Sequence, residues 1–449
     1  MTITSIQASN ETLACAKAFN RFWQRFTGEV LPLQGEQGGL VLQLDPAVPQ
    51  DQILITATAD AITVAAENES ALFKGTMMVL QRLLGKVAVI SETITLSPQK
   101  KLLMVDMGRK FFPLTTLKEL VDSLAIFNFD QLQLHFSENE GFRIESERYP
   151  WLASAEYLTK AEVRELIQYA HGQHIEIIPD FDSPGHLKYV LADKPEWRLD
   201  KLAEDGTLVK DEKALDILNP EAVAFIWSIY EEYAQLFVDC RYFHVGADEF
   251  VPFDDLHNYP TLAKYAAEKY GPEASGIEVF IEYVNKTVAY VRQLGFIPLV
   301  WNDGFYRVNR TEGLHLTKDC MISYWTRWNK NMAPIQTFID LGYTVINHND
   351  NYFYYVLGEH ASYTYPTYEK IMTGWTPVDF PQQQVVNEDQ LTSVAANAIA
   401  IWSDIPDALT PAEVVENVFY LMAALMQKAD QRLLGDQDVI RNIYQGLLQ

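Results

Sequence analysis

Short apolar runs alternate with amphipathic stretches along most of the chain. Before residue 98 the pattern predicts a few short strands and a helix over residues 70–84, where apolar positions recur at helical spacing. From Lys101 onward, strand-like runs alternate regularly with helical segments, which is typical of βα units around a parallel sheet. The segment Ser97-Pro98-Gln99-Lys100 interrupts the pattern. We therefore expect a small α+β domain over residues 1–98 and a larger domain over residues 99–449.

The larger domain contains eight strand-like runs. They end near Met107, Phe136, Pro179, Val245, Val300, Tyr324, Asn347 and Ile401. Eight parallel strands that alternate with helices close most simply into a (β/α)8 TIM barrel, whose active site lies at the carboxyl ends of the strands. Capping boxes at Thr159 and Thr410 mark the starts of two of the helices. The predicted fold class is α/β, with a barrel preceded by a small α+β domain.

Composition and charge exclude several kinds of partner. The chain has 35 basic and 60 acidic residues, a formal net charge of -25, which repels nucleic acid and anionic membrane surfaces. No long apolar run is present, the N-terminus lacks a leader pattern, and the three cysteines are widely spaced. These observations favour a cytoplasmic protein without a membrane partner. The oligomeric state stays open.

The residues that follow the strand-like runs are rich in carboxylates and tryptophans. Sugars present hydroxyl groups to charged side chains and apolar C–H faces to aromatic rings, so this mixture indicates a carbohydrate ligand. The common motifs for phosphate loops, zinc proteases and serine hydrolases are missing from the sequence. We therefore expect neither a cofactor nor a metal ion.

The most informative pair is Asp248-Glu249, which follows the strand-like run Tyr242–Val245 and a Gly-Ala step. Adjacent residues on a regular strand point to opposite faces. Both acids can serve one site only if the chain leaves strand geometry near Gly246, so we expect a bulge or turn there.

Taken together, these segments resemble glycoside hydrolase family 20, the β-N-acetylhexosaminidases. The segments that carry the resemblance, in order, are DMGRKFFP, LHFSENEGFRIESERYP, IEIIPDFDSPGH, HVGADE, WND and IWSD. The likeness extends over nearly the whole chain, including the small N-terminal domain. It implies a retaining exo-enzyme that removes terminal β-linked N-acetylglucosamine or N-acetylgalactosamine from an oligosaccharide or glycoconjugate.

The resemblance also implies roles for the charged residues. Glu249 is the general acid and base, and Asp248 orients the nitrogen of the substrate's 2-acetamido group. Arg109 grips the 3- and 4-hydroxyls, with Glu138 beside it. Asp404 meets the 4- and 6-hydroxyls, although the family usually has the longer glutamate at this position.

Aromatic and supporting residues follow from the same resemblance. Trp301, Trp325 and Trp402 enclose the acetamido methyl group. Asp182, His186 and His244 match positions around the acid pair, although His244 fits equally well as a histidine satisfied inside the barrel. The tyrosine that holds the acetamido carbonyl is assigned to Tyr354, with Tyr352 and Tyr355 as alternatives. The carboxylate that commonly follows this tyrosine two residues later is replaced by Val356.

In this family the substrate supplies its own nucleophile, so neither acid forms a bond to the sugar. For proton donation near neutral pH, we expect the pKa of Glu249 to lie above about 4.3, raised by burial and by the charge of Asp248. Two alternatives remain open. One is the same chemistry with release of a disaccharide, as in a lacto-N-biosidase, and the other is a catalytically silent sugar-binding barrel.

Overall fold

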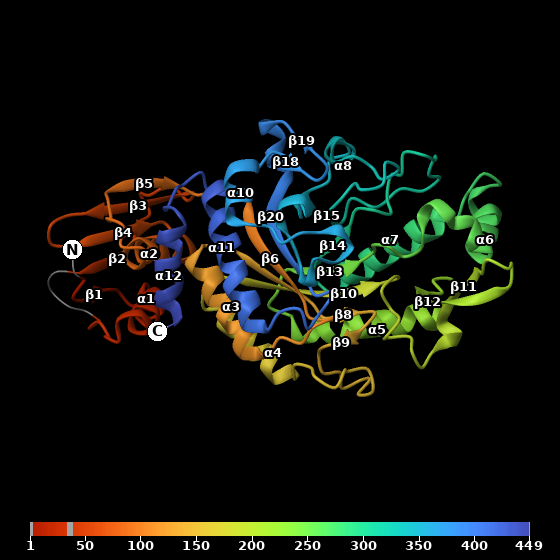
Figure 1. Ribbon diagram of the computed structural model, residues 1–449, viewed down its shortest axis with the longest axis horizontal. Helices are drawn as coiled ribbons and strands as arrows, with labels where there is room; N and C mark the ends of the chain where they lie inside the picture. Colours follow the sequence, from red (N-terminus) through yellow and green to blue (C-terminus); the bar gives the residue numbers. More distant parts are fainter. Residues whose placement is uncertain (1–2, 34–38, 449) are drawn as a thin grey trace.

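The computed structural model describes residues 3–33 and 39–448, and its centre is a closed barrel of parallel strands (Figure 1). The barrel strands are β6 (Lys100–Asp106), β7 (Gln131–His135), β10 (Glu176–Ser183), β13 (Tyr242–Gly246), β14 (Ile297–Trp301), β15 (Met321–Tyr324), β16 (Val345–Asn347) and β20 (Val394–Trp402). Each strand pairs with the next along the chain, β20 pairs with β6, and β16 pairs with β20, which closes the ring. The predicted (β/α)8 barrel is confirmed.

The predicted strand ends agree with the structure to within one residue, except at β10. We expected this strand to end near Pro179, but it continues to Ser183. The extra residues include Asp180 and Asp182, and acidic residues at this point in the sequence indicate a loop. Inside the barrel these carboxylates meet histidines of neighbouring strands, so the strand can continue.

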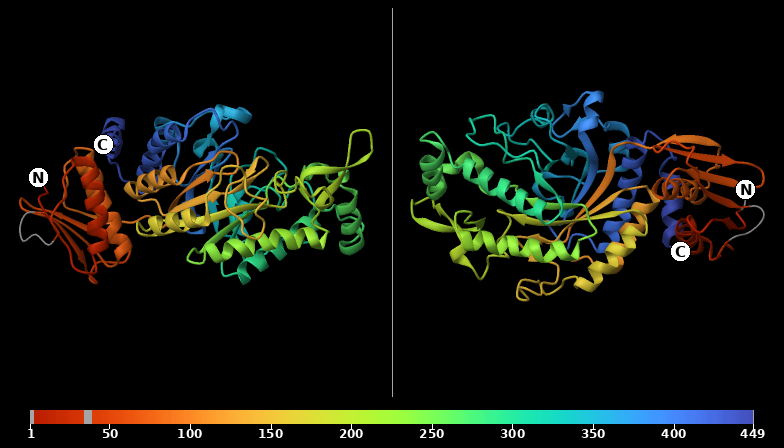
Figure 2. Two further views of the ribbon diagram at one scale, coloured as in Figure 1. Left: turned by 90° about the horizontal axis from the view of Figure 1, so that it is seen from below. Right: turned by 180° about the vertical axis from the view of Figure 1, so that it is seen from behind.

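Helices follow the strands and surround the barrel (Figures 1 and 2). They are α3 (Leu114–Ile126), α4 (Lys160–His171), α5 (Pro220–Leu236), α6 (Pro260–Tyr270), α7 (Ile277–Gln293), α8 (Ile335–Asp340), α9 (Asp350–Phe353), α10 (Tyr368–Gly374) and α11 (Pro411–Ala429). The capping boxes predicted at Thr159 and Thr410 begin α4 and α11. Each satisfies backbone N–H groups that the first helical turn leaves without partners.

Short elements lie in the loops around the barrel, and all except the last 3-10 segment, which leads into β20, follow the carboxyl end of a barrel strand. The paired strands are β8 (Ser137–Glu138) with β9 (Gly141–Phe142), β11 (Arg198–Leu202) with β12 (Leu208–Leu215), and β18 (Asp379–Phe380) with β19 (Gln384–Val385). The 3-10 segments are η1 (Pro195–Trp197), η2 (Phe253–Asn258), η3 (Leu357–Ser362) and η4 (Glu388–Ser393). A further strand, β17 (Tyr354–Val356), runs parallel to the end of β20.

The N-terminal part forms a separate sheet at one end of the molecule, seen in red and orange in Figures 1 and 2. Its strands, in spatial order, are β1 (Ile6–Gln7), β2 (Leu40–Leu44), β4 (Ile62–Ala66), β3 (Gln52–Ala57) and β5 (Glu92–Thr95). Helix α2 (Glu69–Leu84) packs on this sheet and contacts α1 (Leu13–Thr27). The C-terminal helix α12 (Gln437–Leu448) contacts both of these helices, so the end of the chain returns to the N-terminal sheet.

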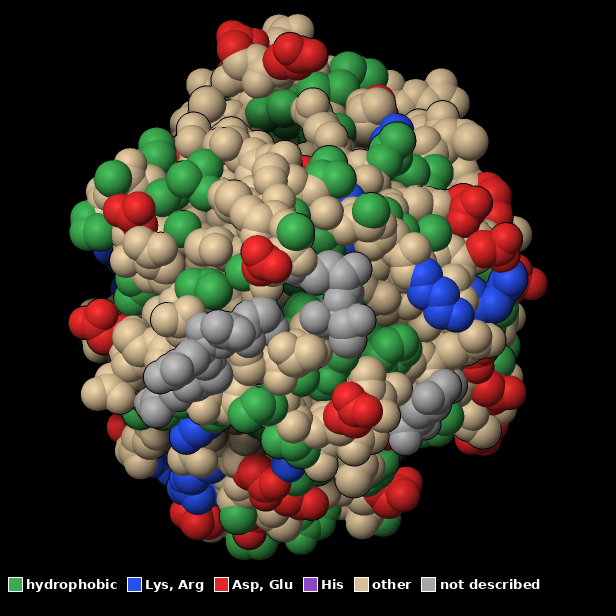
Figure 3. Space-filling model, turned by 90° about the vertical axis from the view of Figure 1, so that its left-hand side faces the viewer, with side chains coloured by type: hydrophobic (Ala, Val, Ile, Leu, Met, Phe, Trp, Pro, Cys, Tyr) green, Lys and Arg blue, Asp and Glu red, His purple; other side chains and the backbone are tan. Residues whose placement is uncertain are grey.

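Apolar side chains from both parts form an extensive buried core. Acidic and basic side chains are scattered over the face that the N-terminal part presents in Figure 3. Among residues 3–33 and 39–448, no helix has the length and apolar character needed to cross a membrane. The proposed division into domains at residues 98 and 99 falls between the last strand of the first sheet and the first strand of the barrel.

Candidate active site

A pocket of about 200 Å³, the catalytic pocket, opens at the carboxyl ends of the barrel strands. Its lining residues are Arg109, Glu138, His186, Asp248, Glu249, Trp301, Trp325, Tyr354, Val356, His360, Ala361, Tyr363, Trp402 and Asp404. Every residue predicted to be catalytic or to bind substrate is in this set. The predicted supporting residues Asp182 and His244 are buried in β10 and β13 and do not line the pocket.

Asp248 and Glu249 both reach the pocket because the chain leaves strand geometry at the end of β13. Gly246, Ala247 and Glu249 have φ values of 75°, 70° and 41°. The register between β10 and β13 shifts at the same point. A Cβ on Gly246 would collide with Asp182, so this position needs both a left-handed backbone and the absence of a side chain. The predicted break near Gly246 is confirmed.

A series of ion pairs connects Arg109 to the two acids. Arg109 Nη2 lies 2.7 Å from Glu138 Oε1, and the same oxygen lies 2.5 Å from His186 Nδ1. His186 Nε2 then lies 3.5 Å from Asp248 Oδ2 and 3.4 Å from Glu249 Oε2. A second bond, from Arg109 Nη1 to Asp106 Oδ2 at 2.8 Å, fixes the guanidinium group against the end of β6. Positive and negative groups therefore alternate along this side of the pocket.

Glu138 and His186 are both buried, and each stabilises the charge of the other. Burial alone would raise the pKa of Glu138, but the charges of His186 and Arg109 outweigh it and hold this pKa well below its usual value. Burial alone would lower the pKa of His186, but Glu138 and Asp248 outweigh it and raise this pKa well above its usual value. His186 is therefore a cation between three carboxylates.

The pKa of Glu249 is lowered, so the prediction that it is raised was wrong. The contact with His186 has the largest influence, and it outweighs burial, which acts in the opposite direction. The Glu249 side chain is also 43% exposed and keeps part of its hydration. In contrast, burial raises the pKa of Asp248, with the charge of Glu249 adding to it and that of His186 opposing it. The sequence alone did not reveal that a cationic His186 touches Glu249.

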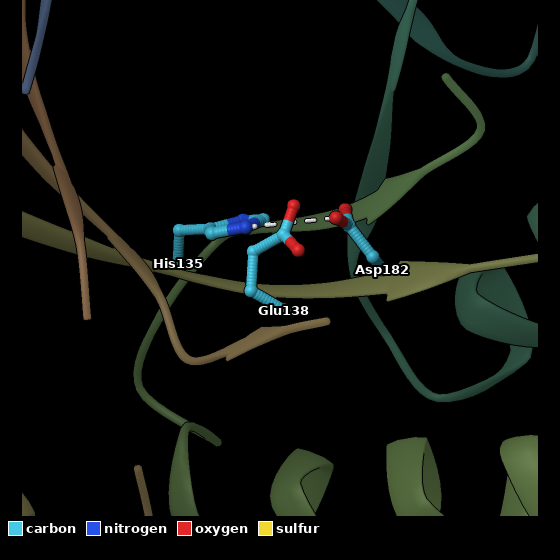
Figure 4. Close-up of side chains that lie close together, drawn as sticks. All are labelled: His135, Glu138 and Asp182. Atoms are coloured by element: carbon cyan, nitrogen blue, oxygen red, sulfur yellow. Dashed lines mark ion pairs between the residues drawn. The ribbon is translucent and has the colours of Figure 1, made fainter. Parts of the chain in front are cut away.

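A second ionic layer lies behind the first, within the barrel. His135 Nδ1 is 3.0 Å from Asp180 Oδ2, and His135 Nε2 is 3.5 Å from Asp182 Oδ2. Although burial opposes it, the Asp182 and Asp180 charges raise the pKa of His135 to about 10. Figure 4 shows the ion pair between His135 and Asp182 with the Glu138 carboxylate beside it. His244 Nδ1 lies 3.4 Å from Asp180 Oδ1, so His244 belongs to this inner layer.

Two groups of side chains have ligand atoms within 4.8 Å of one another, a spacing that can suit a metal ion. One group is His135, Glu138 and Asp182, and the other is Asp182, His186 and Asp248. Each group includes a histidine whose pKa is raised by neighbouring carboxylates. The imidazolium already supplies the positive charge that a metal ion would bring, and a metal would first have to displace its proton. The absence of a metal requirement stays a prediction.

Aromatic rings form another part of the pocket lining. The rings of Trp325 and Tyr354 are parallel, with centroids 5.9 Å apart and an interplanar angle of 2°. The ring centroid of Trp402 lies 5.9 Å from that of Tyr354 and 6.1 Å from that of Trp301, with interplanar angles of 58° and 44°. Trp301 is almost completely buried and packs against His244, with ring centroids 4.7 Å apart. These rings create a narrow apolar recess next to Asp248 and Glu249.

The three candidate tyrosines point to different places. Tyr354 lines the catalytic pocket, and burial raises its pKa well above the usual value, so its phenol stays protonated and can donate a hydrogen bond. The hydroxyl of Tyr352 donates to the carbonyl oxygen of Gly374 at 2.8 Å. The hydroxyl of Tyr355 accepts a bond from Asn417 at 2.8 Å. Only the first of the three therefore faces the acids.

Asp303 is a site residue that we did not predict, although it belongs to the quoted WND segment. Its Oδ2 accepts a bond from the backbone N–H of Glu249 at 2.9 Å, and its Oδ1 accepts one from Trp325 Nε1 at 3.3 Å. Burial, reinforced by the charge of Asp248, raises the pKa of Asp303 to about 7. Asp303 thus connects the acids to the aromatic side. Its position directly after a strand was the available signal.

The rim beside Asp404 also contains residues that were not predicted. Asp404 follows β20, and its Oδ1 lies 3.3 Å from His360 Nδ1 of η3. Ala361 and Tyr363 line the pocket next to His360. Their segment has no regular pattern in the sequence, so no signal for their position was available.

Comparisons with known proteins agree with this geometry. The family model "Glycosyl hydrolase family 20, catalytic domain" matches residues 101–425. A lacto-N-biosidase from Bifidobacterium bifidum is 30% identical over 279 residues, which cover 61% of this chain and 24% of that protein. Beta-hexosaminidase subunit A1 from Dictyostelium discoideum is 27% identical over 277 residues, covering 60% of this chain and 49% of that protein. The chain therefore spans at most about half the length of these two relatives.

Solved structures share the fold. A GH20 exo-β-N-acetylglucosaminidase from Vibrio harveyi superposes with a TM-score of 0.77 at 18% identity, covering 99% of this chain and 73% of that chain. The GH20 β-N-acetylhexosaminidase from Streptomyces coelicolor gives a TM-score of 0.73 at 19% identity, covering 99% and 92%. Both likenesses extend over the N-terminal sheet as well as the barrel.

Proposed function

The chain belongs to glycosyl hydrolase family 20, and from this premise we propose that it is a retaining exo-β-N-acetylhexosaminidase. It removes a terminal, non-reducing β-linked N-acetylhexosamine from an oligosaccharide or glycoconjugate. The observation that supports this most directly is the catalytic pocket, where Asp248, Glu249 and Tyr354 share one recess with three tryptophans. Two acids beside an apolar recess suit a sugar that carries an acetamido group.

In the first step, the acetamido carbonyl oxygen of the bound sugar attacks its own anomeric carbon. Glu249 gives its proton to the glycosidic oxygen as the bond between that oxygen and the anomeric carbon breaks. This forms an oxazolinium ring on the sugar and releases the leaving group as an alcohol. In the second step, water attacks the anomeric carbon and gives a proton to Glu249, which regenerates the acetamido group with retention of configuration.

Glu249 must carry a proton when the first step begins. In the open pocket His186 favours the carboxylate form and lowers the pKa of Glu249. Substrate covers the exposed part of this side chain and removes its water, which favours the neutral acid. Substrate binding therefore prepares the proton donor, because it strengthens the influence of burial, which raises this pKa.

Asp248 and Tyr354 act on the two ends of the acetamido group. The Asp248 carboxylate accepts a hydrogen bond from the amide N–H and stabilises the positive charge that develops there. The phenol of Tyr354, which stays protonated, donates to the acetamido oxygen and aligns it for attack. Trp301, Trp325 and Trp402 enclose the methyl group. All of these contacts hold the nucleophile in a reactive position.

Release of a disaccharide is the second candidate, favoured by the similarity to a lacto-N-biosidase. It requires space beyond the sugar's non-reducing end. In this chain Arg109, Asp404 and His360 stand at the rim, and the pocket holds only about 200 Å³. Sites for drug-sized ligands commonly measure about 300 to 1,000 Å³, so this pocket suits a single sugar ring. These features favour release of a monosaccharide.

The test is a comparison of three 4-nitrophenyl β-glycosides, the N-acetylglucosaminide, the N-acetylgalactosaminide and the glucoside. We expect turnover of at least one of the N-acetylated substrates and almost none of the glucoside, because the glucoside lacks the nucleophile. Equal turnover of the glucoside would contradict substrate assistance. Product analysis on a β-linked N-acetylhexosamine oligosaccharide then separates the two candidates, since a disaccharide as first product would support the second.

A further inference from the structure

We propose that His360 and Asp404 form a composite hydroxyl-binding pair that recognises the 4- and 6-hydroxyls of the terminal sugar and sets the preference between its C4 epimers. The proposal rests on the proposed function. It concerns a rim residue from η3 that the proposed chemistry does not use. Both side chains line the catalytic pocket, together with Ala361 and Tyr363 from the same segment.

The contact between the two side chains leaves one polar atom of each free for a ligand. His360 Nδ1 lies 3.3 Å from Asp404 Oδ1, which orients the imidazole ring and the carboxylate relative to each other. Within the described part of the chain, His360 Nε2 and Asp404 Oδ2 make no hydrogen bond. The side chains are 60% and 24% exposed, so a sugar can reach both. A neutral imidazole offers one donor and one acceptor, and a carboxylate only accepts.

The backbone of η3 holds His360 at this position through an uncommon conformation. Gly358, Glu359, Ala361 and Ser362 have φ values of 78°, 52°, 53° and 68°. Consecutive left-handed residues other than glycine are unfavourable, and they persist only where the surroundings hold them. A segment kept in such a conformation at the mouth of a pocket is typical of a functional role.

Specific contacts tie η3 to the segment that carries Asp404. The backbone N–H of Ile405 donates to the carbonyl oxygen of Leu357 at 3.2 Å. A Cβ on Gly358 would come within 2.6 Å of the Ile405 side chain, so the two segments are in close contact. On the other side, the N–H of Gly358 donates to the Tyr365 hydroxyl at 2.9 Å. His360 and Asp404 are therefore positioned by one shared unit of structure.

Two other polar residues near this end, Arg109 and Tyr363, line the same pocket, but the Tyr363 hydroxyl already donates to Asp350 at 3.1 Å. Val356 lines the same pocket, and its side chain can bind no hydroxyl. Arg109 is already bound to Asp106 and Glu138. His360 therefore adds a hydrogen-bonding atom to the pocket beside Asp404.

The two C4 epimers differ only in the direction of the 4-hydroxyl, so a group that contacts this end of the sugar can distinguish them. The loss of one hydrogen bond between His360 and a sugar hydroxyl corresponds to about a tenfold loss of affinity. We therefore expect H360A to lower kcat/KM for the preferred N-acetylhexosaminide about tenfold. The loss is expected mainly in KM, because the contact lies far from the breaking bond.

The experiment measures kcat and KM for the wild type, H360A and H360Q. Its substrates are the 4-nitrophenyl N-acetylglucosaminide, its 4-deoxy and 6-deoxy analogues, and the N-acetylgalactosaminide. If His360 contacts a hydroxyl, H360A causes almost no further loss on the analogue that lacks that hydroxyl. H360Q is expected to restore much of the activity, because its terminal amide nitrogen stands near the position of Nε2.

H315A is the matched control, since His315 is also exposed and near a carboxylate, Glu312, at 3.9 Å, but does not line the catalytic pocket. It is expected to leave all four substrates unaffected. Unchanged kinetics in H360A would overturn the proposal, and so would equal losses on the parent substrate and both deoxy analogues. Failure of the proposed function looks different, because the wild type itself would then show no preference for N-acetylated substrates over the glucoside.

Discussion

The two halves of the barrel contribute different chemistry to one pocket. The segments after the first four strands, β6, β7, β10 and β13, supply the charged groups, which are Arg109, Glu138, His186, Asp248 and Glu249. The later strands β14, β15, β17 and β20 supply the aromatic rings Trp301, Trp325, Tyr354 and Trp402. Asp303 and Asp404 are exceptions, because they are acidic residues that follow β14 and β20. We call the first set, Arg109, Glu138, His186, Asp248 and Glu249, the charged wall and the second set the aromatic wall of the pocket.

The residues of the two walls depend on their neighbours in different ways. On the charged wall each group sets the pKa of the next, so His186 influences Glu138, Asp248 and Glu249 together. On the aromatic wall the rings contact one another through packing, which holds shape and excludes water. Changes on the charged wall are therefore expected to alter protonation and chemistry. Changes on the aromatic wall are expected to alter alignment.

The largest effect is expected from E249Q on the charged wall. Glutamine keeps the size of the side chain but cannot exchange the proton that the leaving group needs, and general acid catalysis contributes roughly 10² to 10⁴ in rate. We expect kcat on an N-acetylhexosamine disaccharide to fall about 10³-fold. An aryl substrate with a good leaving group should lose less in the first step.

Two observations show whether this loss is specific. E231Q removes a carboxylate on the outside of the barrel, where Glu231 pairs with Arg148 at 2.7 Å, and it should keep normal turnover. The midpoint of thermal unfolding should be similar in both variants. Near-normal disaccharide hydrolysis by E249Q would mean that another group donates the proton.

A somewhat smaller effect is expected from D248N. An asparagine cannot carry the negative charge that stabilises the amide nitrogen, and the loss of one such electrostatic contact costs about 10² to 10³ in rate. Because the nucleophile itself is affected, the loss should appear with good and poor leaving groups alike. Rates for a series of aryl N-acetylhexosaminides of increasing leaving-group ability test this. A loss restricted to poor leaving groups would exchange the roles of Asp248 and Glu249.

On the aromatic wall, Y354F should have a moderate effect. It removes the hydroxyl that aligns the acetamido oxygen but keeps the ring that stacks on Trp325. One hydrogen bond to a developing charge corresponds to about a 10- to 100-fold fall in kcat. Y352F is the matched control, because that hydroxyl bonds to Gly374 outside the pocket. A larger loss of kcat in Y352F than in Y354F would reverse the assignment.

Much of the barrel could be predicted from the sequence because its strands are buried on both faces. Such strands read as continuous apolar runs, and their ends were correct to within one residue wherever polar residues stop the run. At β10 the rule failed, since Asp180 and Asp182 are buried carboxyl groups with histidine partners from β7 and β13. The return of α12 to the N-terminal helices could not be predicted, because an amphipathic pattern does not say which partner covers the apolar face.

The segments of the charged wall could be predicted because they follow strand-like runs, and the resemblance then selected the residues within them. The aromatic wall was harder. Tyr354 does not follow β16 directly but comes after the short helix α9, on its own strand β17, so the resemblance had to select it from three tyrosines. His360 and Ala361 lie in an irregular segment, and no pattern marked them. The pKa of Glu249 depends on distances across the pocket, which a linear sequence does not contain.

The smallest effect, a displacement of a pH profile, is expected from H186Q. In the free enzyme His186 is the largest influence that lowers the pKa of Glu249. Without this cation the Glu249 carboxylate is less stable, so its pKa rises and the acid keeps its proton to higher pH. The alkaline limb of kcat/KM, which reports the proton donor of the free enzyme, should therefore move to higher pH. H171Q, on the outer helix α4, should leave the profile unchanged. An alkaline limb that stays at the wild-type pH would show that burial, and not the neighbouring cation, controls the proton of Glu249, and the charged wall would then not act as one coupled unit.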